Sequence, residues 1–172
     1  VFRIDPDGVL HQVATDMNHP NGLAFSPDES LLYVTNTRPN PHMYVYDVSA
    51  DGSLSNGREF AEMPYVPGGP DEGDTFTAHS GAKRPIGERG GVPDGLKVDS
   101  AGRVFSTGPG GCWVWELNGE FLGLIETPEL PANVGWGGTD FKTLYLTSRS
   151  SVYSLRVKTP GTPVPGMPGA TA

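Results

Sequence analysis

The chain has 172 residues, of which 24 are glycine and 17 are proline, and its formal net charge is −8. Its 12 Lys and Arg residues are scattered along an acidic chain, which excludes the basic face that nucleic-acid binding requires. No run of about eighteen apolar residues is present to predict a membrane-spanning helix, and the single cysteine, Cys112, excludes an intrachain disulfide.

Short alternating apolar segments, bounded by glycine and proline turns, predict strands through the first part of the chain. The first two strands form a hairpin, and the next four form one antiparallel unit. These six strands are expected at residues 1–5, 9–15, 21–26, 31–37, 43–49 and 57–63. The four-strand unit spans roughly 40 residues, which is the length of one β-propeller blade, and we expect almost no helix anywhere.

The same pattern returns in the second part of the chain. Four more strands are expected within residues 95–127 and three within 133–157. About thirteen strands correspond to half of a six-bladed ring, within the range of about four to eight blades seen in propellers. We therefore predict an all-β fold, a partial six-bladed β-propeller with about three blades in residues 1–158. This chain would be the C-terminal half of a longer domain, and a missing N-terminal half would complete the ring.

Two segments interrupt the strand pattern. Residues 64–91 are rich in Gly, Pro and charged residues, and they predict a long insertion. Because this insertion directly precedes the turn at 93–95, we expect it to lie over a pocket entrance. Residues 159–172 have the Pro- and Gly-rich composition of a disordered tail.

A short motif repeats at the start of equivalent strands. Pro-Asn-Gly-Leu at 20–23 returns as Pro-Asp-Gly-Leu at 93–96, and a weaker third copy contains Asn133. Asn21 and Asn133 each lie 12 residues before a tyrosine, and Asp94 lies 11 before a phenylalanine. In a radial repeat, equivalent residues converge on the central axis, where they can share one ligand.

The residue types in this motif indicate a cation site. Pro-Asn-Gly and Pro-Asp-Gly form turns in any protein, but their recurrence at equivalent strands favours a functional role. Amide and carboxylate oxygens suit a hard divalent cation, and a carboxylate beside a metal can also act as a base toward water. We predict Asn21 and Asp94 as metal ligands and Asp94 as the catalytic residue. Asn133 either lines the substrate pocket or is a structural asparagine.

Other residues that could carry chemistry have a simpler interpretation. His19 precedes the first motif and is interpreted as structural or solvated rather than as a ligand. Cys112 is expected to be a buried thiol. Three cationic side chains are interpreted as solvated charges of the expected insertion: His79, Arg84 and Arg89. Three aromatic residues are expected in the core between blades: Trp113, Trp115 and Trp136.

Three segments resemble the gluconolactonase/regucalcin family, also called the senescence-marker-protein family. They are HPNGLAFSPDESLLYVTNT (19–37), GVPDGLKVDSAGRVFSTGPGGCWVWELNGEFLGLIETPE (91–129) and PANVGWGGTDFKTLYLTS (131–148). The resemblance implies a six-bladed propeller that holds one divalent cation at its channel mouth and hydrolyses sugar lactones to aldonic acids. Calcium is the usual cation, and zinc, magnesium or manganese are alternatives.

The resemblance also assigns residues. Asn21 matches the family's metal-binding Asn, and Asp94 matches its metal-binding and proposed catalytic Asp. The family's other ligands, including a Glu in a Glu-Gly-Pro segment, belong to the N-terminal half, and no Glu-Gly-Pro occurs here. We therefore expect this chain alone to be inactive.

The sequence thus predicts a metal-dependent hydrolase whose partner is a small sugar lactone, with neither a nucleic-acid nor a membrane partner. An organophosphate or ester hydrolase on the same scaffold, and a non-catalytic calcium-binding propeller, remain alternatives. A cytoplasmic location is expected, and a periplasmic or secreted one remains open because the first residue, Val1, falls within a strand pattern.

Overall fold

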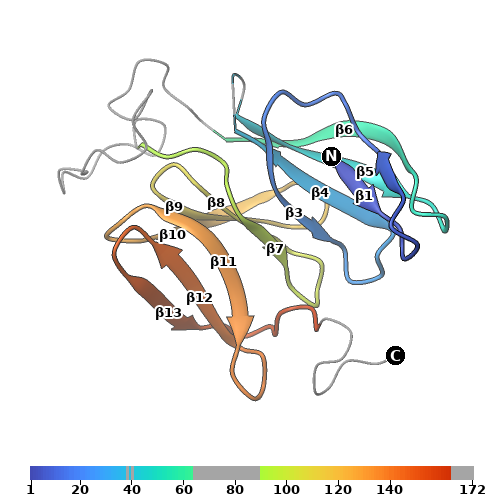
Figure 1. The fold of residues 1–172 in the computed structure, drawn as a ribbon. Helices are drawn as coiled ribbons and strands as arrows, with labels where there is room; N and C mark the ends of the chain where they lie inside the picture. Colours follow the sequence, from blue (N-terminus) through green and yellow to red (C-terminus); the bar gives the residue numbers. More distant parts are fainter. Residues whose placement is uncertain (38, 40, 64–89, 164–172) are drawn as a thin grey trace.

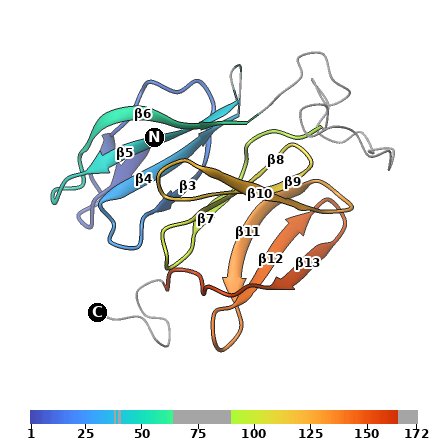
Figure 2. The ribbon, with the colours of Figure 1, turned by 180° about the vertical axis from the view of Figure 1, so that it is seen from behind.

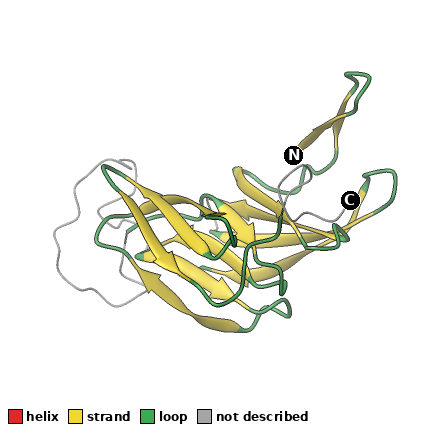
Figure 3. Cartoon of the chain, turned by 90° about the horizontal axis from the view of Figure 1, so that it is seen from below, coloured by secondary structure: helices red, strands yellow, loops and turns green. Residues whose placement is uncertain are grey.

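The structure is a computed structural model that describes residues 1–37, 39, 41–63 and 90–163. These residues form thirteen strands joined by loops and turns, without a helix (Figure 3). The described part of the chain accordingly offers no helix with the length and apolar character needed to cross a membrane. The all-β prediction is confirmed.

The strands form four separate antiparallel sheets (Figures 1 and 2). The first is a hairpin of β1 (Phe2–Ile4) and β2 (Leu10–Gln12). Blade 1 consists of β3 (Pro20–Phe25), β4 (Leu31–Asn36), β5 (His42–Val48) and β6 (Leu54–Glu62). Blade 2 consists of β7 (Leu96–Val98), β8 (Val104–Gly108), β9 (Gly111–Trp115) and β10 (Phe121–Glu126). Blade 3 consists of β11 (Pro131–Gly137), β12 (Thr143–Ser148) and β13 (Val152–Arg156).

The sheets have the connectivity of propeller blades. Within each sheet the strands pair in chain order, so each blade is an antiparallel meander. The first strands of the three blades are neighbours, with β7 between β3 and β11 (Figures 1 and 2). The predicted grouping of two, four, four and three strands is confirmed, and the chain forms a partial β-propeller.

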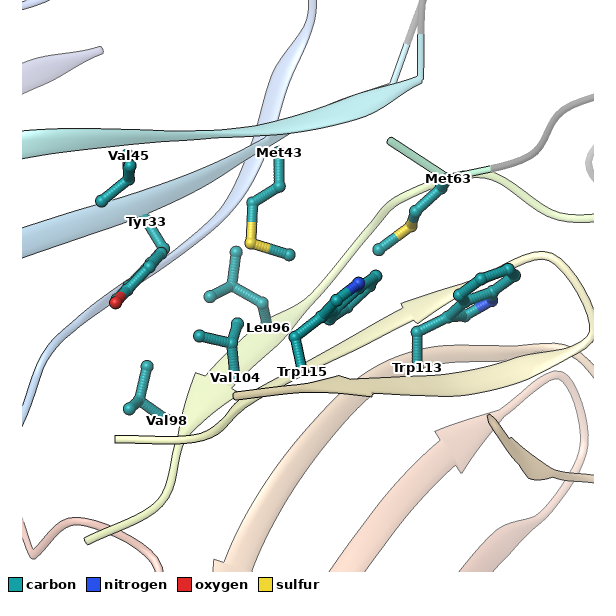
Figure 4. Packing of buried hydrophobic residues seen from close by; sticks show 9 residues of the cluster. All are labelled: Tyr33, Met43, Val45, Met63, Leu96, Val98, Val104, Trp113 and Trp115. Atoms are coloured by element: carbon teal, nitrogen blue, oxygen red, sulfur yellow. The ribbon is translucent and has the colours of Figure 1, made fainter. Parts of the chain in front are cut away.

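The hydrophobic core lies between the blades rather than within them. Between blades 1 and 2, buried side chains from both sheets point into one layer, and Met63 lies beside them (Figure 4). The members of this cluster are Tyr33, Met43, Val45, Met63, Leu96, Val98, Val104, Trp113 and Trp115. Trp113 and Trp115 stack with ring centroids 5.9 Å apart, which confirms both as core residues between blades.

A second buried cluster joins blade 2 to blade 3. Its members are Phe105, Cys112, Val134, Leu144 and Leu146. Cys112 is fully buried, as predicted, and burial raises the pKa of its thiol. Trp136 packs against this cluster and meets the ring of Phe105 edge to face at 4.9 Å. Both blade interfaces are therefore apolar sheet-on-sheet contacts.

The start of the predicted tail is ordered. Ser100 donates a backbone hydrogen bond of 3.0 Å to Pro160, and Gly161 donates one of 3.0 Å to Phe141. A side chain on Gly161 would meet the ring of Trp136 at 2.4 Å. Residues 159–163, which were predicted as part of the tail, thus lie between blades 2 and 3. Residues 164–172 of the tail and 64–89 of the insertion lie outside the described part of the structure.

Several strands expose large apolar side chains. On the hairpin, Phe2 is 61% exposed and Ile4 71%. On β3, Leu23 is 47% exposed and Phe25 44%. These two residues lie on the face of blade 1 opposite Ala24, which packs in the blade 1–blade 2 core. A further blade against this face would bury them, as the preceding blade does for Leu96 in blade 2 and for Val134 in blade 3.

Candidate functional site

The first strands of blades 1 and 2 approach each other very closely at Gly22. Its backbone amide donates a hydrogen bond of 3.1 Å to the carbonyl of Asp94, and the Thr35 hydroxyl donates one of 2.7 Å to the same carbonyl. A Cβ atom on Gly22 would lie 2.2 Å from that carbonyl oxygen. Only glycine permits this approach, and it brings Asn21 next to Asp94.

The same contact recurs between blades 2 and 3. The Gly95 amide donates a hydrogen bond of 2.9 Å to the carbonyl of Ala132, and the Thr107 hydroxyl donates one of 3.1 Å to it. Gly95 and Thr107 thus repeat the roles of Gly22 and Thr35. In this structural repeat the residue equivalent to Asp94 is Ala132.

The register of the third copy therefore differs from the predicted one. Pro131 and Ala132 correspond to the Pro20 and Asn21 positions, and Asn133 takes the place of the glycine. Both β3 and β11 have a bulge at this point. The predicted register depends on the distance to the strand aromatic across the hairpin turn, and these turns differ in length. The equivalent cross-strand partners in the three blades are Lys97 with Phe105, Ala24 with Tyr33, and Gly135 with Tyr145. The sequence distance between the two partners increases by one residue from each of these pairs to the next.

Asn21 and Asp94 come together at the end of the sheets where the first strands begin, here called the mouth. Asp94 is half-buried, and this burial raises the pKa of its carboxyl, while a hydrogen bond from the Asn21 side chain acts in the opposite direction. The Asn21 Nδ2 also donates a hydrogen bond of 3.3 Å to the Thr37 hydroxyl. The two predicted ligands are therefore in direct contact across the junction of two blades.

Asn133 lies beside this pair but in a different setting. A Cβ on the buried Gly95 would lie 2.1 Å from the Asn133 Oδ1, so the two strands touch here as well. The Oδ1 atom accepts a hydrogen bond of 2.8 Å from the Val134 amide. Asn133 thus contacts Gly95, the residue that follows Asp94, although it is not the equivalent of Asp94 in the repeat. Its predicted role in lining the substrate pocket stays a prediction.

The chemistry of the contact pair suits a cation. Asn21 offers a neutral amide oxygen and Asp94 an anionic carboxylate, which are oxygen ligands of the kind that hard cations prefer. Calcium takes about six to eight such ligands, and the described ranges contain no group of three or more His, Cys, Asp or Glu residues that could hold a metal. Asn21 and Asp94 can supply part of a calcium coordination shell, and other residues must supply the remaining ligands.

The other predicted residues have the following places. The His19 amide donates a hydrogen bond of 2.9 Å to the Oδ1 of the buried Asn36, and the His19 carbonyl accepts one of 2.9 Å from Thr37. The backbone of His19 thus fixes the turn that carries Asn21. Three predicted insertion residues lie outside the described part of the chain: His79, Arg84 and Arg89.

The hydroxyl residues that join the blades were not predicted from the sequence. Thr35 and Thr107 are fully buried, and each bridges the first strand of its own blade to that of the next. Thr147 occupies the same place in blade 3 and is exposed. The signal was present, because a threonine recurs near the end of the second strand in each of the three copies.

The fold and this ladder of first strands define a class, the β-propellers. The sequence model of the SMP-30/gluconolactonase/LRE-like region matches residues 1–150. The chain therefore belongs to the SMP-30/gluconolactonase/LRE-like family.

Curated relatives and solved structures agree with this assignment. The gluconolactonase of Zymomonas mobilis is 34% identical over 166 residues, which cover 94% of this chain and 41% of that protein. The pentonolactonase of Haloferax volcanii is 33% identical, over 86% of this chain and 44% of that protein. A solved gluconolactonase from Xanthomonas campestris is 30% identical with a TM-score of 0.68, over 92% of this chain and 44% of that chain. The chain thus spans less than half the length of each.

Proposed function

We propose that this chain is part of a metal-dependent hydrolase that opens sugar lactones to aldonic acids. The observation that carries the proposal is the contact between the Asn21 amide and the Asp94 carboxyl across the junction of two blades. Relatives named as gluconolactonase and pentonolactonase, both above 30% identity, support the reaction class. The proposal concerns the complete protein, because the chain spans only part of its relatives' length.

In this proposal Asp94 has two roles. Its carboxylate is a ligand, and one of its oxygens also accepts a proton from the water that attacks the lactone carbonyl carbon. The ring C–O bond then breaks, and a proton returns to the leaving ring oxygen to give a hydroxy acid. Partial burial favours this role, because a raised pKa makes the Asp94 carboxylate a stronger base.

Asn21 has a different role. As a neutral ligand it contributes an oxygen without adding negative charge, so the developing oxyanion meets less repulsion. A divalent cation bound by Asn21 and Asp94 would polarise the lactone carbonyl as a Lewis acid. Calcium is the proposed cation, with zinc, magnesium and manganese as alternatives.

The test is lactone hydrolysis by the complete protein, measured by acid release from gluconolactone and a pentonolactone. We expect turnover that chelation abolishes and that one cation restores when Ca²⁺, Zn²⁺, Mg²⁺ and Mn²⁺ are added back in turn. Organophosphate and aryl ester substrates are assayed beside the lactones. Faster turnover of those substrates, or calcium binding without turnover of any, would contradict the proposal and favour one of the two alternative functions.

A further inference from the structure

We propose that Thr37 is a positioning residue that orients the Asn21 side-chain amide at the mouth. This inference rests on the proposed function, because the amide orientation matters only if Asn21 binds a ligand there. Thr37 follows β4 directly, and its backbone amide is already bound to the His19 carbonyl at 2.9 Å. The position of its side chain relative to the Asn21 turn is therefore fixed by the main chain.

The direction of the Thr37 hydroxyl hydrogen decides whether this hydroxyl can bind the amide nitrogen or the amide oxygen of Asn21. The hydroxyl donates a hydrogen bond of 2.9 Å to the carbonyl of Pro93, on the neighbouring blade. A hydroxyl has one hydrogen, so toward Asn21 the Thr37 oxygen can only accept. It accepts from the Asn21 Nδ2 at 3.3 Å. The amide nitrogen is thereby held on Thr37, and the amide oxygen points to the other side.

Comparison of the three blades shows that the hydroxyl of Thr37 is not needed to join one blade to the next. Thr35 is repeated as Thr107, and each bridges two first strands through backbone carbonyls. Two residues after Thr35, Thr107 and Thr147, the three blades carry Thr37, Pro109 and Arg149, respectively. The junction of blades 2 and 3 thus forms with a proline at the Thr37 position. A hydroxyl occurs there only in the blade that carries Asn21.

Loss of this hydroxyl would leave the Asn21 amide nitrogen held only by the Asp94 carboxyl. A cation on that carboxyl would displace this bond, and binding would then have to select and fix the productive orientation of the amide. One hydrogen bond of this kind corresponds to roughly a 3- to 10-fold change in an equilibrium constant. We expect Thr37→Val, which keeps the side-chain shape, to weaken cation binding by about this factor.

The experiment measures cation binding to the complete protein by calorimetric titration with Ca²⁺ alone, repeated with Zn²⁺, Mg²⁺ and Mn²⁺. Thr37→Val should bind about 3- to 10-fold more weakly, and Thr37→Ser, which keeps the hydroxyl, should stay within about twofold of wild type. The matched control is Thr143→Val. Thr143 accepts a hydrogen bond of 2.9 Å from Arg156 at the opposite end of β12 from the mouth, so its loss should leave the affinity unchanged.

The outcomes distinguish the two proposals. If wild type binds no cation, the metal site and the role of Thr37 are both overturned. If wild type binds and Thr37→Val binds equally well, only the role of Thr37 is overturned. Equal weakening in Thr37→Ser or in Thr143→Val would also overturn it, because general destabilisation would then explain the loss. Urea unfolding of the metal-free variants checks that they fold, and Thr37→Ala serves as a second variant with the same expected loss.

Discussion

Replacing Gly22 with alanine tests whether the close approach of β3 to β7 is what brings Asn21 beside Asp94. Gly22 does not have a positive φ, so alanine there introduces no backbone strain of its own. The added Cβ would instead lie 2.2 Å from the Asp94 carbonyl oxygen and 2.9 Å from the Gly95 Cα. Both atoms belong to the backbone of β7 and its entry turn, so neither can move aside as the end of a flexible side chain could.

The cost follows from this geometry. A normal carbon–oxygen contact is roughly 3.3 Å, so the two strands must separate by about 1 Å. The Gly22–Asp94 hydrogen bond of 3.1 Å would then lengthen to about 4 Å and be lost. Overpacking costs about 1–3 kcal/mol and the lost bond about 1 kcal/mol. We expect Gly22→Ala to lower the free energy of unfolding by about 2–4 kcal/mol and to weaken cation binding as well.

The assay is urea unfolding of the complete protein, together with calcium titration of the folded variant. Gly135→Ala is the matched control, because a Cβ on that β11 glycine would meet nothing within 4 Å. The control should cost less than about 0.5 kcal/mol, as most surface substitutions do. Equal stability of Gly22→Ala and Gly135→Ala would refute the argument that β3 and β7 must touch at this residue.

Three further predictions concern the rest of the chain. The isolated 172-residue chain should self-associate, because Phe2, Ile4 and Val152 are 61%, 71% and 66% exposed; a sedimenting monomer with cooperative unfolding would contradict this. Thr107→Val should lower the free energy of unfolding by about 0.5–1.5 kcal/mol, measured in urea, because it removes the buried hydroxyl that donates to the Ala132 carbonyl and leaves that carbonyl with the Gly95 amide alone. The Asp28 carboxyl should titrate with a midpoint of about 2 by NMR, because the Ser26 and Ser30 hydroxyls lower its pKa. Its contribution to stability is then complete above the ordinary value of 3.8 and is lost as the pH falls toward 2, and a midpoint near 3.8 would contradict the predicted contacts.

The strands and their grouping could be predicted because their signals are local. Alternation in segments such as 31–37 and 43–49, and the turns between them, depend only on neighbouring residues. The pairing of Asn21 with Asp94 was also predictable, because the same Pro and Gly residues flank both. These flanking residues align the two copies of the motif whatever the length of the hairpin turn that follows.

The features that the sequence did not reveal depend on contacts between distant residues. The distance from Asn133 to Tyr145 misleads by one position, because the hairpin turn of blade 3 is longer than that of blade 1. Residues 159–163 have the composition of a tail, yet Gly161 fits against Trp136 and pairs with the Phe141 carbonyl. Thr37 likewise gains its role only when Pro93, 56 residues away, lies beside it.

The measurement that tests the central claim most directly is the turnover of Asp94→Asn in the complete protein at saturating cation, with Asn21→Ala beside it. Asparagine keeps an oxygen ligand but cannot accept a proton at neutral pH, so we expect kcat on gluconolactone to fall by roughly 10²–10⁴ even when the cation is bound. Asn21→Ala should instead bind the cation more weakly and recover most of its kcat at high cation concentration. A kcat near that of wild type for Asp94→Asn at saturating cation would contradict the account, because Asp94 would then be a ligand without being the base.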